Sequence, residues 1–337
     1  MEKLMTRIPK FLAFAVLLAA PAAAQMKTVN GAGATFPYPI YSKWFDEYHK
    51  VKPELQINYQ SIGSGGGIRQ ITERTVDFGA TDGPMTEEQL MKTDASILHI
   101  PTVLGAVVPA YNLKGVSDLK LSGPVLADIF LGKIKRWTDP AIVKLNPGAA
   151  LPDAAITVVH RSDGSGTTYC WVDYLAKVSP EWKTKVGVAT AVKWPIGLGG
   201  KGNEGVAGLV KLTPNSLGYV ELIYAKQNAI AYASVLNKSG KFVKAAIPSV
   251  TAAAAGVKMP KDYRVSITDA AGAEAYPVST FTWMLVYEKN AGDKGAVLKE
   301  FLKWMLKDGQ GMASTLGYAP LPDSVIAMVA KTIETIK

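Results

Sequence analysis

Three segments of the sequence combine glycine with serine or threonine where a predicted strand runs into a predicted helix. They are residues 30–37 (NGAGATFP), residues 63–67 (GSGGG) and residues 161–168 (RSDGSGTT). The start of a helix leaves backbone N–H groups unpaired and carries partial positive charge. Glycine lets an anion approach those groups, and hydroxyls add further donors. One such turn is usually only a capped helix, but three in one chain predict convergence on one tetrahedral oxyanion across a cleft.

The third turn also carries a charge. Arg161 ends an apolar strand, where its guanidinium would face inward at the start of the next helix, and Asp163 would hold that fork in place. The alternative is an ion pair on the surface. Because the donor-rich residues Ser165, Gly166 and Thr167 follow at once, the pattern favours anion binding.

Asp82 is an unexpected residue type beside such turns. It follows the predicted strand over residues 76–80, and its alternative role is to cap a turn or a helix. A carboxylate repels an anion unless the anion carries a proton that it can donate. Phosphate carries one at neutral pH and sulfate does not, so Asp82 near the site would indicate phosphate.

The sequence argues against several classes of enzyme. It contains no GxxxxGK[ST] phosphate loop, and Ser165 lies in DGSG, not in the GxSxG of serine hydrolases. The histidines, His49, His99 and His160, show no metal-ligand spacing. Cys170, the only cysteine, lies in an apolar helical pattern and is predicted to be a buried structural thiol. An exported phosphatase remains the alternative hypothesis.

The elements that must position these residues follow an α/β pattern, in which short apolar runs alternate with amphipathic segments. Predicted strands cover residues 28–33, 55–62, 76–80, 155–160 and 217–224. Predicted helices cover residues 37–50, 67–74, 124–132, 166–177, 205–211, 295–306 and 324–336, and another begins at Thr86.

Two long extended runs, residues 97–111 and 275–288, interrupt this alternation. Their length predicts connections that cross between two domains, and a chain of 337 residues is long for a single domain. The first domain would then be discontinuous, 25–109 plus 275–337, and the second would be 110–274.

Composition and charge narrow the class of protein. Hydrophobic residues make up 48% and charged residues 19%, enough to bury a large core. The net charge of +9 comes from singly scattered Lys and Arg, without the basic runs of a nucleic-acid-binding protein. A mildly basic surface suits an anionic ligand through electrostatic steering.

Residues 1–24 have the pattern of a cleavable signal peptide. A basic start with Lys3, Arg7 and Lys10 precedes an apolar stretch over residues 11–20, and small residues precede Gln25. The alternative, a membrane anchor, needs roughly 20 apolar residues. The sequence therefore predicts an exported protein whose mature chain begins at Gln25.

Several segments together resemble the periplasmic phosphate-binding proteins of bacterial phosphate ABC transporters. They are residues 31–37 (GAGATFP), 76–80 (VDFGA), 131–137 (LGKIKRW), 163–167 (DGSGT), 193–203 (KWPIGLGGKGN) and 217–221 (LGYVE), spread over nearly the whole mature chain. The resemblance implies a type II periplasmic-binding fold, with two α/β domains joined by a two-strand hinge. It also implies a monomeric periplasmic protein that needs no cofactor or metal and catalyses nothing. Such a protein delivers inorganic phosphate to the permease and ATPase subunits of an importer.

The resemblance further implies a phosphate held by backbone N–H groups, hydroxyls, one arginine and one acceptor aspartate. Matched by motif, these residues are Ala34, Thr35, Phe36, Ser64, Asp82, Arg161, Ser165, Gly166 and Thr167, with Asp163 bracing the arginine. The chain departs from the expected pattern at Gly65, Thr81 and Ser162, where Ser, Ser and Ala are usual. None of these replaces a matched ligand. A secreted adhesin or phosphate-scavenging surface protein on the same fold remains a further alternative.

Overall fold

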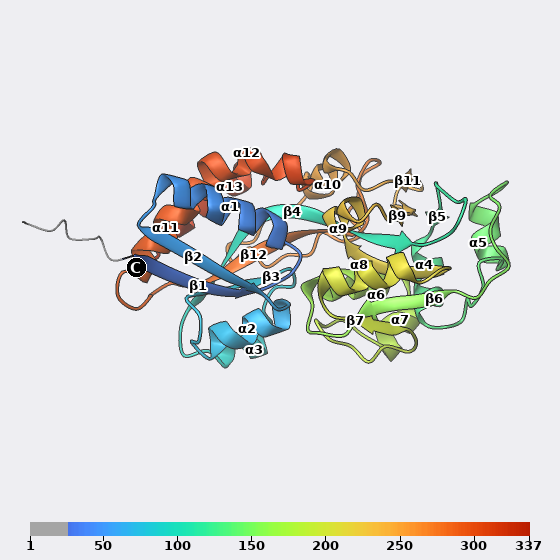
Figure 1. Ribbon diagram of the computed structural model, residues 1–337, viewed down its shortest axis with the longest axis horizontal. Helices are drawn as coiled ribbons and strands as arrows, with labels where there is room; N and C mark the ends of the chain where they lie inside the picture. The colour runs from blue at the N-terminus through green and yellow to red at the C-terminus, as the bar shows by residue number, and fades with distance from the viewer. Residues whose placement is uncertain (1–25) are drawn as a thin grey trace, which may run out of the picture.

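The computed structural model describes residues 26–337, which form two lobes side by side along the long axis (Figure 1). The predicted signal peptide and the cleavage site before Gln25 lie outside the described residues. Within residues 26–337, no helix combines the length and the apolar character needed to cross a membrane.

One continuous path of paired strands runs through both lobes, in the order β2-β1-β3-β12-β4-β8-β6-β7, and β9 also pairs with β4. Its strands are β1 Lys27–Gly33, β2 Leu55–Ser61, β3 Phe78–Thr81, β4 Ile97–Tyr111, β6 Thr157–Arg161, β7 Leu198–Gly200, β8 Ser216–Glu221, β9 Ala231–Tyr232 and β12 Ser279–Tyr287. A smaller sheet contains β5 Lys120–Leu121, β10 Ser234–Leu236 and β11 Phe242–Val243. The predicted α/β class is confirmed.

Helices cover the sheet in both lobes (Figure 1). Those of the first lobe are α1 Tyr38–Val51, α2 Ser64–Thr72, α3 Glu87–Met91, α11 Lys294–Trp304, α12 Gln310–Ala313 and α13 Asp323–Ile333, with the π-helix η1 Met305–Gly309 and the 3-10 turn η2 Ser314–Leu316. Those of the second lobe are α4 Gly123–Phe130, α5 Pro140–Leu145, α6 Gly166–Val178, α7 Pro180–Lys185, α8 Gly202–Leu212 and α9 Leu222–Gln227. Helix α10 Ile247–Ala254 packs on β4 and β12.

Strand β4 connects the two lobes. Its first part, up to Ala106, pairs with β12, and its second part, from Val107, pairs with β8. The predicted strand over residues 97–111 is therefore confirmed. The second predicted run, residues 275–288, was too long, because the strand there, β12, covers only Ser279–Tyr287. Strand β12 pairs with β3 and β4. The domain boundaries at 25–109, 275–337 and 110–274 remain a prediction.

The sequence analysis did not predict the short helices α5, α7 and α9, because each is too short to show a clear apolar periodicity. The predicted strand over residues 217–224 ends at Glu221, whose carboxylate accepts a hydrogen bond from Ile223 N (2.7 Å) and so begins α9. Helices α5 and α7 start with proline at the first turn behind the caps Asp139 and Ser179. Proline at this position costs no hydrogen bond, since the first N–H groups of a helix are unpaired.

An aromatic layer holds α1 on the sheet of the first lobe. Tyr41 packs on Trp44 and Phe45, and both Tyr41 and Phe45 pack on Tyr59, which stacks on Phe78. Burying one large apolar side chain contributes roughly 1.5–3 kcal/mol, so this layer fixes α1 firmly. The turn between β1 and α1 is therefore fixed on one side by the pairing of β1 in the sheet and on the other by the packing of α1.

His99 anchors the chain just beyond Asp82. It lies on β4 with 3% exposure, and its Nε2 accepts a hydrogen bond from Met85 N (3.1 Å). Burial, helped by the charge of Arg264, lowers the pKa of His99 from 6.5 to about 3. The imidazole therefore stays neutral in the folded protein at any pH above this value.

We expect His99→Gln to reduce the acid sensitivity of the fold. Between pH 6.5 and 3 the unfolded chain binds a proton at His99 that the folded protein does not, so stability falls as pH falls through this window. From pH 7 to pH 5 the loss attributable to His99 is about 2 kcal/mol. Urea unfolding at both pH values measures it, with His49→Gln as the control for replacing a histidine. Equal pH dependence of His99→Gln and the parent would contradict the prediction.

Candidate anion-binding site

The three donor-rich turns meet at the junction of the two lobes. The first lies between β1 and α1, the second starts α2, and the third joins β6 to α6. Gly65 N donates to Gly164 O (2.9 Å), and Gly166 N donates to Ser64 Oγ (3.0 Å). These bonds join α2 of the first lobe directly to the third turn in the second lobe.

Glycine permits a close approach where the two turns touch. A Cβ on Gly65 would lie 3.0 Å from Gly164 Cα, and a Cβ on Gly164 would lie 3.0 Å from Gly65 Cα. A Cβ on Gly166 would lie 2.6 Å from both Asp82 N and Ser64 Oγ. Gly65, where serine is usual, therefore lies at a close backbone contact with Gly164 of the other lobe.

Arg161 and Asp163 form a buried two-pronged ion pair. Arg161 Nε donates to Asp163 Oδ1 (2.8 Å) and Nη2 donates to Oδ2 (2.6 Å), while the arginine side chain is 1% exposed. Burial alone would raise the pKa of Asp163, but the hydrogen bonds and charge of Arg161 and the amide of Gly202 outweigh it and lower the pKa. Nη1 lies 3.4 Å from Thr167 Oγ1, which places the guanidinium among the hydroxyls.

Ser64 and Ser165 both accept hydrogen bonds from backbone N–H donors. Ser64 Oγ accepts from Gly166 N and from Asp82 N (3.3 Å), and Ser165 Oγ caps α6 by accepting from Thr168 N (3.0 Å). Both serines are fully buried. A hydroxyl whose oxygen already accepts still has its own proton to donate, so both serines are available as donors.

Asp82 lies in the same place with 1% exposure. Its Oδ1 accepts from Thr282 Oγ1 (2.9 Å), a residue of β12 that the sequence prediction did not include. Burial raises the pKa of Asp82 from 3.8 to about 7, against the opposing effects of Thr282, Arg161 and Ser64. Among the expected site residues, Asp82 is the one whose side chain can accept and cannot donate when ionised.

The first turn contributes Ala34, Thr35 and Phe36, all buried. Ala34 N donates to Ala80 O (3.0 Å). Within residues 26–337, no acceptor pairs with the backbone N–H of Thr35 or Phe36. Thr35 Oγ1 instead accepts from Asn203 Nδ2 (2.8 Å), which also lies 3.1 Å from Thr167 Oγ1. The structure thus brings all the expected residues into one neighbourhood and adds Asn203 and Thr282.

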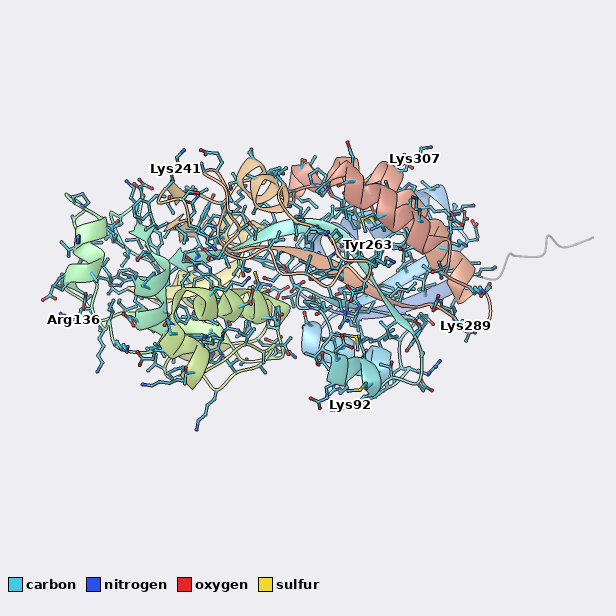
Figure 2. All side chains as sticks on the ribbon, turned by 180° about the vertical axis from the view of Figure 1, so that it is seen from behind. Lys92, Arg136, Lys241, Tyr263, Lys289 and Lys307 are labelled. Carbon is cyan, nitrogen blue, oxygen red and sulfur yellow. The ribbon has the colours of Figure 1, made fainter. Side chains whose placement is uncertain are left out.

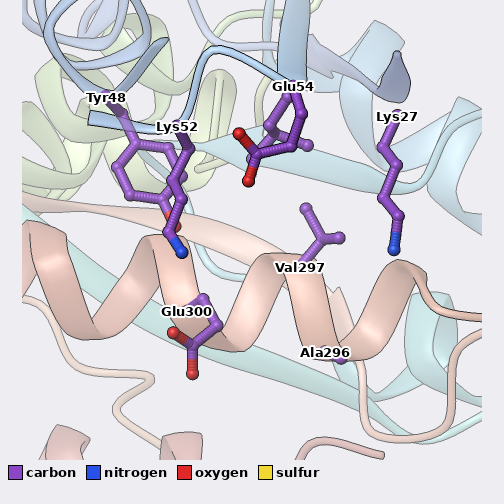
Figure 3. A pocket seen from close by; sticks show the side chains of 8 residues that line it. Lys27, Tyr48, Lys52, Glu54, Ala296, Val297 and Glu300 are labelled. Carbon is purple, nitrogen blue, oxygen red and sulfur yellow. The ribbon is translucent and has the colours of Figure 1, made fainter. Parts of the chain in front are cut away.

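A groove on the first lobe lies away from this junction. The groove in Figure 3, of about 360 Å³, lies between α1, β2 and α11. Lysines and glutamates of both signs line it, among them Lys27, Lys52, Glu54 and Glu300. Lys27 is already paired with Asp293 (2.6 Å), and the groove contains none of the Gly, Ser and Thr donors of the three turns.

Comparison with known proteins agrees with this geometry. A family model described as a PBP superfamily domain matches residues 18–308. The phosphate-binding protein PstS of Pasteurella multocida is 50% identical, covering 90% of this chain and 89% of that protein. The phosphate-binding protein PstS of Methanocaldococcus jannaschii is 40% identical, covering 92% of this chain and 86% of that protein. The chain belongs to the PstS phosphate-binding proteins of the PBP superfamily.

Solved structures of this superfamily share the fold. PfluDING, a high-affinity periplasmic phosphate-binding protein bound with phosphate, matches with a TM-score of 0.75 at 20% identity, over 90% of this chain and 93% of that one. The phosphate-binding protein of Stenotrophomonas maltophilia matches with a TM-score of 0.72 at 18% identity, with the same coverage. The expected two-domain periplasmic-binding fold is confirmed.

We expect Asp82→Asn to remove a pH dependence of stability in phosphate-free buffer. The folded protein holds a proton on Asp82 between about pH 4 and pH 7 that the unfolded chain has lost, so this contribution to stability disappears as pH rises through the window. The difference is on the order of 4 kcal/mol. Unfolding by urea at pH 4, 6 and 8 measures it, with the exposed Asp118→Asn as control. A constant stability difference between the parent and Asp82→Asn at these pH values would refute the expected shift.

Proposed function

We propose that this protein binds one inorganic phosphate ion in the closed cleft and delivers it to a phosphate ABC importer. One observation carries the proposal: donor-rich turns from both lobes meet around a buried arginine, with the buried carboxyl of Asp82 beside them. The PstS relatives, named as phosphate-binding proteins, support the choice of ligand.

In the proposed complex each group has one role. The unpaired N–H groups of Thr35 and Phe36 and the guanidinium of Arg161 donate to phosphate oxygens. The hydroxyls of Thr35, Ser64, Ser165 and Thr167 donate as well, and Ala34 and Gly166 form the wall. Asp82 accepts the proton that phosphate carries at neutral pH. Asp163 holds Arg161 and does not touch the ion.

We also propose that phosphate entry and release need a hinge motion. The moving bodies would be 25–109 plus 275–337 on one side and 110–274 on the other. Support comes from β4, which pairs with β12 before Val107 and with β8 after it. At the same crossing point, Val107 N donates a hydrogen bond to Val278 O (2.9 Å), just before β12 begins. Closure of two bodies about such connections is a common form of ligand capture.

The proposed setting is the periplasm, where the monomeric protein would deliver phosphate to an importer built from permease and ATPase subunits. The pattern of residues 1–24 supports export. Membership of the PstS family supports the importer as partner.

We propose binding without turnover. Ser165 Oγ caps α6 through Thr168 N, an arrangement that favours donation of its proton to an anion. A nucleophile would need that proton removed by a base. Incubation of the purified protein with a chromogenic phosphate ester separates the two functions, because release of product that Ser165→Ala abolishes would favour a phosphatase.

We expect Arg161→Ala to weaken phosphate binding by at least about a hundredfold. The change removes charge-assisted hydrogen bonds, each contributing roughly 1.5–3 kcal/mol, and leaves Asp163 as an unpaired anion beside the ligand. Calorimetric titration of phosphate-stripped protein measures the loss. Arg136→Ala is the matched control, because Arg136 also pairs with an aspartate but is half-exposed at the far end of the second lobe (Figure 2). Unchanged affinity in Arg161→Ala would remove this residue from the site.

We expect Asp82→Asn to lose discrimination between phosphate and sulfate. The two anions have the same shape, so N–H and hydroxyl donors hold either one, and only an acceptor distinguishes them. Against sulfate the carboxylate would press two anionic groups together in a desolvated site, at a cost of several kcal/mol. The amide of asparagine can donate to sulfate instead. The ratio of the two affinities should therefore fall by at least about tenfold at neutral pH.

Competition titration with both anions measures this ratio, with Asp77→Asn as the control carboxylate at the start of the same strand segment. If Asp82→Asn discriminates as sharply as the parent, Asp82 is only a structural residue and the selectivity arises elsewhere.

A further inference from the structure

We propose that Asn203 is the positioning residue that turns the threonine hydroxyls of both lobes toward the bound anion and locks the cleft. The inference rests on the proposed function, because it concerns the same site. Asn203 lies at the start of α8, is fully buried, and has every polar atom of its side chain engaged.

The orientation of the Asn203 amide follows from its partners. Its Oδ1 accepts from Glu221 N (2.9 Å), and a backbone N–H can only donate. Nδ2 therefore points the other way, to Thr35 Oγ1 (2.8 Å) and Thr167 Oγ1 (3.1 Å). The first threonine belongs to the first lobe and the second to α6, so one amide joins hydroxyls on opposite sides of the cleft.

These contacts fix the direction of both hydroxyl protons. Thr35 Oγ1 accepts from Asn203 Nδ2 and also from Asn203 N (3.2 Å). Thr167 Oγ1 accepts from Asn203 Nδ2 and lies within reach of Arg161 Nη1 (3.4 Å). A hydroxyl oxygen has two lone pairs, so each oxygen is saturated and its own proton must be donated elsewhere. Both threonines are thereby made donors, as an anion with several unprotonated oxygens requires.

The same contacts cap α8 from the opposite lobe. The N-cap residue Lys201 makes no side-chain hydrogen bond to the helix. Gly202 N donates to Asp163 Oδ1 (3.1 Å) within the second lobe, and Asn203 N donates to Thr35 Oγ1 in the first lobe. Opening the cleft would leave a helix N–H without its partner, which favours the closed form.

Asn203 is also tied to the crossing point of the chain. Glu221, whose N–H it accepts, ends β8 and pairs with Val107, the residue at which β4 passes from one lobe to the other. The amide thus contacts the end of β8, beside the crossing point of β4, and also the first turn and α6. Removing it should accelerate opening and the loss of phosphate while leaving the encounter rate nearly unchanged.

The test is a double-mutant cycle on phosphate affinity and rates, with Asn203→Ala, Thr35→Val and the double variant measured by stopped-flow and calorimetry. We expect Asn203→Ala to weaken phosphate binding by about tenfold or more, mainly through faster dissociation. We expect a smaller further loss when it is added to Thr35→Val than when it is made in the parent, because one of the two hydroxyls that Asn203 orients is already gone. Asn146→Ala is the matched control, since Asn146 is a buried amide of the same lobe that bonds backbone groups away from the cleft.

Asn203→Asp covers the case in which the alanine variant does not fold. It keeps the volume and the bond from Glu221 N but removes both donors, and its charge would only weaken phosphate binding further. Parent-like affinity in a folded Asn203 variant, or losses that simply add in the cycle, would overturn the role of Asn203 and leave the proposed function intact. A parent protein that does not bind phosphate would instead overturn the proposed function itself.

Discussion

The carboxylate of Asp163 is the constraint from which the cleft is built. A guanidinium that is 1% exposed needs a partner of opposite charge, and Arg161 donates two hydrogen bonds to the two carboxylate oxygens of Asp163. Leaving one member of such a buried pair alone costs roughly 3–5 kcal/mol. Asp163 Oδ1 accepts in addition from Gly202 N, so the same residue sets the end of β6 and the start of α8. The ion pair and the start of α8 are therefore joined into one unit.

The donors of the site follow from that unit. Residues immediately after Asp163 start α6, where Ser165 caps the helix, and α8 presents Asn203 toward both Thr35 and Thr167. On the other side, Ser64 meets Gly166 N at the start of α2. Each hydroxyl oxygen accepts at least one hydrogen bond from an N–H group of the protein, so its own proton remains available to an anion. The hydroxyl oxygens of the site thus have hydrogen-bond partners within the protein, and their protons are still free to bind an anion.

The local parts of this design could be predicted from sequence, and the long-range parts could not. Arg161, Asp163 and Ser165 lie within five residues of chain, and a strand, a turn and a capped helix are visible in their pattern. Asn203 meets Thr35 across 168 residues and Thr282 meets Asp82 across 200. An asparagine in a glycine-rich turn and a threonine in an apolar strand have no feature that specifies such partners before the lobes are folded together.

The charge balance of the cleft decides how it attracts an anion. Arg161 is neutralised by Asp163, and burial raises the pKa of Asp82 to about 7, so that this carboxyl is either neutral or negative at neutral pH. The cleft therefore holds no excess positive charge. Attraction inside it has to come from oriented N–H and hydroxyl dipoles, which bind at short range and depend on geometry. The net charge of +9, spread over the whole chain, acts at longer range and on the rate of encounter. Recognition and steering are thus performed by different parts of the molecule.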